Sequence, residues 1–102
     1  MPIVHLAFEV VPRTPGQEAY YRQVEAALKA VQESGLRYAV GPLETTVEGE
    51  LDDVLAVVSR AHKAVAAAGA DHIHTVIKID YDRGGPPLGL DQKMRRIAAF
   101  NR

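Results

Sequence analysis

The stretch from Ser34 to Glu50 constrains the fold of this chain more than any other part of the sequence. It begins with a Ser-Gly pair after a long helical pattern, and a glycine just past the last helical residue is a common helix cap. Apolar and polar residues then alternate, stop at Gly41 and Pro42, and alternate again with β-branched residues. The acidic residues that follow favour the positive end of a helix dipole. The stretch therefore predicts a helix end, a β-hairpin and a helix start.

The remaining residues supply two more strands and the helices between them. Alternating apolar residues predict strands over 3–11 and 71–80, in addition to the hairpin strands over 36–40 and 45–49. The order β-α-β-β-α-β has two helical crossovers, each of which joins parallel strands with a third strand between them. It predicts an α+β ferredoxin-like sandwich, one domain over residues 1–102, with antiparallel sheet order 4-1-3-2 and a short C-terminal helix. The helices are expected from about Gln17 to the Ser34-Gly35 cap, from Leu51 to the Gly69 cap, and from Asp91 onward.

Composition excludes several classes of protein. The 102 residues suit one domain, and a net charge of −1 with dispersed Lys and Arg argues against a nucleic-acid or anionic-membrane partner. The absence of cysteine excludes disulfides, thiol catalysis and thiolate metal ligands. Apolar runs are far shorter than the roughly 18 residues of a membrane span, and no basic segment precedes an apolar one at the N-terminus. We therefore expect a cytoplasmic protein.

The informative surface is the sheet face that the two long helices leave open. Alternation places a mixture of apolar and ionisable side chains there, which is typical of a partly covered face, most simply one covered by a second copy of the sheet. An ordinary solvated sheet face is the alternative. Pairing the strands around their midpoints predicts contacts of Glu9 with His74, of His5 with Lys78, and of Glu48 with His5. The residues expected on this face are Ile3, His5, Ala7, Glu9, Arg37, Ala39, Thr46, Glu48, His72, His74, Val76 and Lys78.

The residue pattern indicates neither a metal site nor an active site. His5, His72 and His74 are of a type that binds zinc, but no motif supplies a fourth ligand, so we expect no structural metal. No nucleophile–base–orienter arrangement and no glycine-rich loop opening a helix is recognisable. Glu48 and Glu50 are paired carboxylates of the kind used in acid–base catalysis, but a hairpin exit and a helix start explain Glu50 more simply. We expect a protein that is not an enzyme and needs no cofactor.

The motif Ser-Gly-Leu-x-Tyr-x-Val-Gly-Pro-x-x-Thr-x-x-Glu-Gly-Glu, which occupies residues 34–50, resembles the signature of the thiamine-binding protein family, formerly a domain of unknown function. The resemblance extends through Asp53-Val54, Ala61-His62 and the exit from the last strand to Lys93, and so covers nearly the whole chain. Glu44 departs from it, because the family often has a small residue at that position.

The resemblance implies a function for the open sheet. Family members resemble ferredoxin-like protomers that assemble through their sheets into dimers or tetramers, bind thiamine or its hydroxymethylpyrimidine part, and have no assigned catalytic activity. A thiamine site needs a hydrogen-bond acceptor for the exocyclic amine, a carboxylate, and an apolar or aromatic wall. Glu48 is expected to be the most sensitive position. The candidate ligand-binding residues are Glu48 and Glu9 as carboxylates, Thr45 and Thr46 as hydroxyls, and Tyr38 and Phe8 as walls.

Several alternatives stay open at this stage. Thr45 and Glu48 should face opposite sides of one strand, so a ligand that touches both requires a site at a sheet edge or between subunits. β-Propensity alone explains Thr45, and core packing alone explains Tyr38. The rival function is a regulatory or oligomerisation domain, without a ligand or sensing an amino acid. An RNA-recognition module is disfavoured, because the open face has no aromatic residue to stack on bases. We expect a homo-oligomer, a dimer or most simply a tetramer built as a dimer of dimers. The exact ligand and its use in transport, storage or sensing are not predicted.

Overall fold

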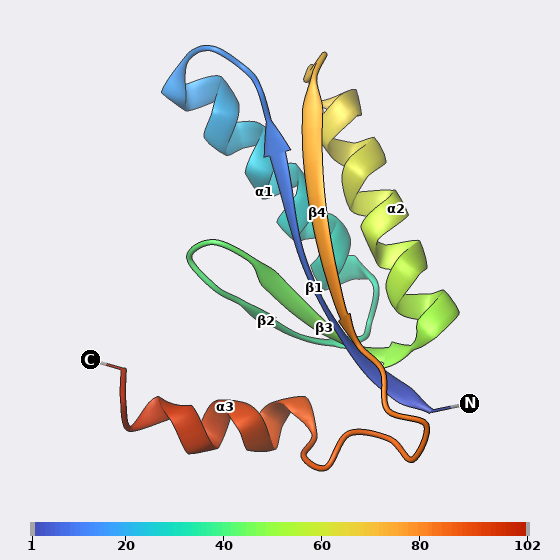
Figure 1. Cartoon of the computed structure of the whole chain (residues 1–102). Helices are drawn as coiled ribbons and strands as arrows, with labels where there is room; N and C mark the ends of the chain where they lie inside the picture. Colours follow the sequence, from blue (N-terminus) through green and yellow to red (C-terminus); the bar gives the residue numbers. More distant parts are fainter. Residues whose placement is uncertain (1, 102) are drawn as a thin grey trace.

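Residues 2–101 are described by the computed structural model, and they form a four-stranded antiparallel sheet with strand order β2-β3-β1-β4. This is the predicted order 4-1-3-2 read from the other edge, so the α+β ferredoxin-like fold is confirmed (Figure 1). The elements are β1 (Ile3–Pro12), α1 (Gln17–Glu33), β2 (Arg37–Val40), β3 (Thr45–Glu50), α2 (Leu51–Ala67), β4 (Ile73–Asp80) and α3 (Leu90–Ala98).

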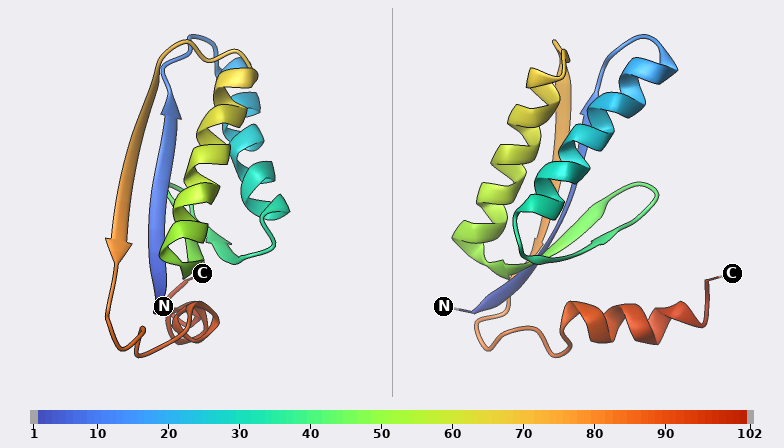
Figure 2. Two further views of the ribbon diagram at one scale, coloured as in Figure 1. Left: turned by 90° about the vertical axis from the view of Figure 1, so that its right-hand side faces the viewer. Right: turned by 180° about the vertical axis from the view of Figure 1, so that it is seen from behind.

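Helices α1 and α2 lie side by side on one face of the sheet, as the edge-on view in Figure 2 shows. Helix α2 presents its apolar stripe to the sheet, because apolar residues three and four positions apart share one side of a helix, whereas α1 buries Gln23 together with Ala27 and Val31. Gly35 and Gly69 follow the two helices with φ angles of 77° and 107°, the left-handed conformation that glycine adopts without strain. The fully buried side chains of the resulting core include Val4 and Leu6 of β1, Val31 of α1, Val47 of β3, and Val54, Val57 and Val65 of α2.

The register of the open face confirms one predicted contact and corrects two. His5 lies opposite Glu48 on β3, as expected. On β4, however, His5 faces Asp80 and Glu9 faces Val76, so the predicted pairs His5–Lys78 and Glu9–His74 are wrong by two residues. The reason is that β4 begins at Ile73, opposite Pro12, and pairs with the far end of β1 rather than with its midpoint.

His72 therefore precedes β4 and lies outside the paired part of the sheet. Its carbonyl accepts a hydrogen bond from the Arg13 amide at 2.7 Å, which closes the sheet at this end.

Helix α3 lies apart from the two-helix layer and runs across the end of the sheet where β1 begins (Figures 1 and 2). The sequence predicts that Leu90, Met94, Ile97 and Ala98 dock this helix. Only Leu90 is buried, whereas Met94 and Ile97 are 41% and 48% exposed. The helix is thus held at its first turn, and its later apolar residues stay accessible. Within residues 2–101, none of the helices combines the length and the apolar character that a membrane span requires.

Candidate functional site

Two hollows lie on opposite sides of the sheet. The first, which we call the hairpin hollow, has a volume of about 280 Å³ and separates α1 from the turn between β2 and β3. Its walls include aromatic rings, carboxylate residues and one hydroxyl. The lining residues that matter below are Phe8, Glu9, Tyr20, Tyr21, Glu44 and Thr45.

Aromatic side chains form one wall of the hairpin hollow. Tyr20 and Tyr21 begin α1 with their ring centroids 5.2 Å apart and their planes at 83°, an edge-to-face pair. Phe8 is buried beneath them on β1. Of these three residues only Phe8 is among the predicted site residues. Two adjacent aromatic residues near the start of a helix are nevertheless a visible signal, because only one of them fits the buried side of the helix.

Polar groups border the same hollow. Thr45 is 6% exposed and faces the helices. It pairs with Phe8 at the last step of the β1–β3 ladder, so β1 continues past this point with no β3 partner. Because backbone groups of a strand alternate between its two edges, the N–H and C=O of either Glu9 or Val10, which both line the hollow, lie at the edge that β3 leaves unpaired. An unpaired strand edge of this kind offers a donor and an acceptor side by side.

The second hollow, which we call the α3 hollow, has a volume of about 420 Å³ and lies between α3 and the open sheet face. It combines apolar groups from the strands and from α3 with basic and acidic groups. The lining residues used below are His5, Ala7, Lys78, Asp80, Lys93, Met94 and Ile97.

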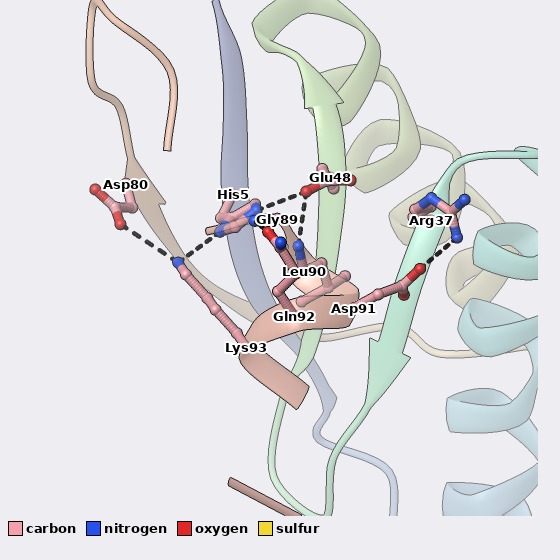
Figure 3. A network of polar contacts seen from close by, with 9 residues as sticks. All are labelled: His5, Arg37, Glu48, Asp80, Gly89, Leu90, Asp91, Gln92 and Lys93. Carbon is pink, nitrogen blue, oxygen red and sulfur yellow. Dashed lines mark hydrogen bonds and ion pairs between the residues drawn. The ribbon is translucent and has the colours of Figure 1, made fainter. Parts of the chain in front are cut away.

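Glu48 connects the sheet to α3. Its Oε2 atom lies 2.9 Å from Nε2 of His5 and accepts a hydrogen bond from the Leu90 amide at 2.8 Å (Figure 3). The carboxylate therefore stands at the N-terminus of α3, where the helix dipole favours negative charge. Burial raises the pKa of the Glu48 carboxyl, but the hydrogen bonds from His5 and Leu90 and the charge of Arg37 hold that pKa below its ordinary value.

The tautomer of His5 follows from its two partners. Nζ of Lys93 lies 2.6 Å from Nδ1 of His5, and an ammonium group can only donate. Nδ1 must therefore be the acceptor, which puts the ring hydrogen on Nε2, where it is donated to Glu48. Lys93, a neutral His5 and Glu48 thus form a continuous chain of hydrogen bonds, in which the His5 side chain is 5% and the Glu48 side chain 17% exposed.

The residue pattern does not predict this chain. The structure aligns Lys93, His5 and Glu48 in that order (Figure 3). The sequence could not show it, because the three residues come from β1, β3 and α3. As an ammonium that donates to His5, Lys93 has no free lone pair and is not a nucleophile in this arrangement.

Two further contacts fix the start of α3. Nη1 of Arg37 donates to Oδ2 of Asp91 at 2.6 Å across an exposed ion pair. Oε1 of Gln92 accepts a hydrogen bond from the Gly89 amide at 2.8 Å, which satisfies one donor at the helix end.

Comparison with known proteins decides the family. Residues 6–98 match the sequence profile described as thiamine-binding protein. The chain belongs to the thiamine-binding protein family. The resemblance inferred from residues 34–50 is thereby confirmed.

Relatives of this family member support the assignment in sequence and in structure. A UPF0045 protein of Mycobacterium bovis is 36% identical over 98 residues, which cover 95% of this chain and 93% of the relative. A Bacillus cereus structure described as a domain of unknown function, DUF77, is 42% identical, with a TM-score of 0.82 over 93% of this chain and 89% of that one. A Thermotoga maritima structure described as a candidate thiamine biosynthesis/salvage protein is 26% identical, with a TM-score of 0.80 over 93% and 98%.

In this thiamine-binding family member, the six candidate residues do not meet at one place in the protomer. Phe8, Glu9 and Thr45 line the hairpin hollow, and Thr46 lines the α3 hollow. Glu48 bonds to two residues that line the α3 hollow, on the sheet face opposite Thr45. Tyr38 lies on β2 opposite Val47, facing the helices, and lines neither hollow. The predicted opposition of Thr45 and Glu48 is confirmed.

The histidines of the described chain are dispersed. Among residues 2–101, no three His, Asp or Glu side chains come close enough together to hold a metal ion. His5 is engaged by Glu48 and Lys93, and Nδ1 of His62 lies 2.9 Å from the Thr75 hydroxyl. The absence of a structural metal stays a prediction.

Proposed function

We propose that this protein binds thiamine or its hydroxymethylpyrimidine moiety, without turnover, in the hairpin hollow and next to a subunit interface. The observation that carries the proposal is the coincidence, in one hollow, of aromatic walls, a buried hydroxyl and an unpaired strand edge. This hollow includes Gly41, Pro42 and Thr45, which belong to the segment with the family signature. The family match and the Thermotoga maritima relative support a thiamine-related role.

The hollow suits the pyrimidine part of thiamine. An aminopyrimidine presents an exocyclic amine beside a ring nitrogen, so it pairs with a neighbouring carbonyl and N–H of a strand edge. The backbone of β1 past Phe8 offers such a pair, and the Thr45 hydroxyl supplies a further group. Flat aromatic walls from Phe8 and Tyr20 complete the recognition of the ring.

The hollow also suits the positive charge of thiamine. A thiazolium ring is attracted to carboxylates and to the faces of tyrosine rings. Tyr21 is 53% exposed and lines the hollow, as does Glu44. Glu9 also borders the hollow, but its side chain belongs to the open face, opposite Val76. Oε1 of Glu44 also lies 3.1 Å from Nζ of Lys78, in an exposed ion pair that water screens.

The other candidates enter this proposal through a second protomer. A ligand in the hairpin hollow cannot reach Thr46 or Glu48 of the same chain, because these side chains lie on the opposite face of the sheet. They contribute directly only where the open face of one protomer adjoins the hairpin hollow of another. Tyr38 shares a face of β2 with Val40, which lines the hollow, and contributes from beside it.

Assembly is part of the same proposal. We expect a homo-oligomer, and most simply a tetramer built as a dimer of dimers. Closed two-fold symmetry is the commonest arrangement of soluble homo-oligomers. Apolar residues on the open face and at the sheet edges support it, because Ile3, Val40, Val76 and Ile77 are 39%, 51%, 45% and 42% exposed. Native mass spectrometry of the freshly purified protein reports the subunit number and any small molecule that co-purifies. A monomer at micromolar concentration would contradict the assembly.

The binding proposal is tested by calorimetry with thiamine and with hydroxymethylpyrimidine. Thr45→Val keeps the β-branched shape and removes the hydroxyl, and Thr75→Val, on β4, is the matched control. We expect both compounds to bind and Thr45→Val alone to weaken them. If neither compound binds and an amino acid raises the melting temperature instead, the rival regulatory function is favoured. The cytoplasmic location expected from the sequence belongs to this proposal and is checked by cell fractionation.

A further inference from the structure

We propose that the α3 hollow is a second ligand site, which binds a small monocarboxylate with a compact apolar body. The hollow lies on the face of the sheet opposite the hairpin hollow, so this site is separate from the proposed thiamine site. Its volume of about 420 Å³ falls within the range of small-molecule pockets.

Lys93 supplies the group that recognises the carboxylate. An ammonium has three donors, and one of them is directed to Nδ1 of His5 at 2.6 Å. Oδ2 of Asp80 lies 3.8 Å from the same nitrogen, beyond hydrogen-bond distance, and Asp80 is 72% exposed. Two donors of Lys93 are therefore available to a ligand in the hollow that it lines.

The chain of hydrogen bonds behind Lys93 holds this cation in place before a ligand arrives. His5 is 5% exposed and is itself fixed by Glu48, which also holds the Leu90 amide (Figure 3). Lys93 loses less conformational entropy on binding than a free surface lysine would, because its ammonium is already positioned. His5 and Glu48 are positioning residues for this site, and Lys93 is its contact.

The apolar side of the hollow determines the body of the ligand. Ala7 contributes a small side chain from the middle of β1, and Met94 and Ile97 face the hollow from α3. These two α3 residues are 41% and 48% exposed, so an apolar group between them and the sheet would remove their surface from water.

The charges around the hollow favour a carboxylate over a phosphate. Lys78 and Lys93 are the cations that line it, and each has a carboxylate nearby: Oε1 of Glu44 lies 3.1 Å from Nζ of Lys78, and Oδ2 of Asp80 lies 3.8 Å from Nζ of Lys93. A monocarboxylate brings one negative charge beside these carboxylates. A phosphate monoester carries up to two charges and would be repelled more strongly.

The test uses the full chain and three probes that share a phenyl group: benzoate, benzamide and phenyl phosphate. Amide chemical shifts locate each probe and give its affinity. We expect benzoate to shift the signals of Ala7, Lys78 and Met94 in a saturable manner, with benzamide and phenyl phosphate at least tenfold weaker. Loss of a charge-assisted hydrogen bond predicts that Lys93→Gln weakens benzoate about tenfold or more. Lys63→Gln, a lysine exposed on α2, is the control and should change nothing.

Two further variants keep the test decisive if Lys93→Gln loosens α3. Ala7→Leu fills the hollow from the sheet side and leaves the polar chain intact, so benzoate binding should be lost while the melting temperature changes little. Lys78→Gln removes the second cation without touching α3 and should weaken benzoate severalfold.

Shifts that appear elsewhere or nowhere, or equal affinities for benzoate and benzamide, would overturn the proposal. Tighter binding of phenyl phosphate would overturn the choice of a carboxylate. If thiamine shifts these same signals, the two sites are not separate and the proposal is refuted. If thiamine does not bind at all, the proposed thiamine function fails but the carboxylate site in the α3 hollow is unaffected.

Discussion

The carboxylate of Glu48 accepts a hydrogen bond from the Leu90 amide at 2.8 Å, so a residue in the middle of the sheet caps the first turn of the last helix. Glu48, the leading ligand-binding candidate from the family signature, thus also has a structural role in the protomer. Stability and ligand affinity must therefore be measured on the same variants.

Glu48→Gln keeps the shape of the side chain and removes its charge. Charged hydrogen bonds contribute more than neutral ones, so we expect a loss of about 1 kcal/mol in the free energy of unfolding, or about 4–8 °C in melting temperature. Calorimetry with thiamine separates the two roles of Glu48. A loss of one to two decades in affinity, as expected from the sequence, requires a site shared between subunits. Unchanged affinity with lowered stability would assign Glu48 to holding α3 alone.

The lowered pKa of Glu48 predicts a pH dependence. In the folded protein this carboxyl takes up its proton at a lower pH than in the unfolded chain, whose glutamates titrate near the ordinary value of 4.5. The stabilisation is therefore complete above that value and is lost as the pH falls through the folded pKa. Between pH 6 and pH 3, the melting temperature should fall more steeply with decreasing pH for the natural chain than for Glu48→Gln. An equal pH dependence of the two melting temperatures would contradict a lowered pKa of Glu48.

Tyr21→Ala tests the aromatic wall of the hairpin hollow. A cation near an aromatic face contributes about 0.5–2 kcal/mol, so we expect thiamine to bind a few-fold to about thirtyfold more weakly. Tyr81→Ala is a matched control, because Tyr21 and Tyr81 are 53% and 52% exposed and Tyr81 lies in the loop before α3. Equal losses in the two variants would remove Tyr21 from the site.

Leu6→Ala tests the core of the fold. Leu6 is fully buried on the central strand, and deleting such a side chain costs about 2–5 kcal/mol because a cavity is left behind. Leu43→Ala, at the 77% exposed tip of the hairpin turn, should cost less than about 0.5 kcal/mol. Chemical denaturation of both variants gives the comparison, and similar losses would mean that the β1 packing is misassigned.

Prolonged treatment with a chelator should leave the melting temperature unchanged. The reason is that His5 already pairs with Glu48 and Lys93 and does not need a metal to satisfy it. A large drop that zinc or another divalent ion reverses would show a structural metal site that the residue pattern does not indicate.

The sequence predicts the fold well because its signals are local. Gly35 and Gly69 mark helix ends, and alternation separates the two faces of every strand, so Thr45 and Glu48 are correctly placed on opposite sides. Strand register depends instead on where β4 begins, and one misjudged boundary shifted the partners of His5 and Glu9 by two residues.

The sites were harder to predict because they join distant segments. Lys93 contacts His5 because the loop before α3 brings this helix back to the sheet. The periodicity of apolar residues does not predict the path of a loop. Tyr20 lines the hairpin hollow together with residues of the turn at 41–44, and the spacing of apolar residues in α1 does not show which loop a helix residue will meet.

Neighbouring threonines serve the two hollows, since Thr45 lines the hairpin hollow and Thr46 the α3 hollow. The side chains of a strand alternate with a period of two, so inserting or deleting one residue inside β3 would exchange every side chain beyond it between the two faces. Thr45, Val47 and Gly49 would then lose their places against the helices. The turn at 41–44 carries no such constraint, because it ends before the strand begins. Length variation in the β2–β3 hairpin should therefore be confined to this turn, and loop grafts that keep Glu44, which pairs with Lys78, should reshape the hairpin hollow without disturbing the other face.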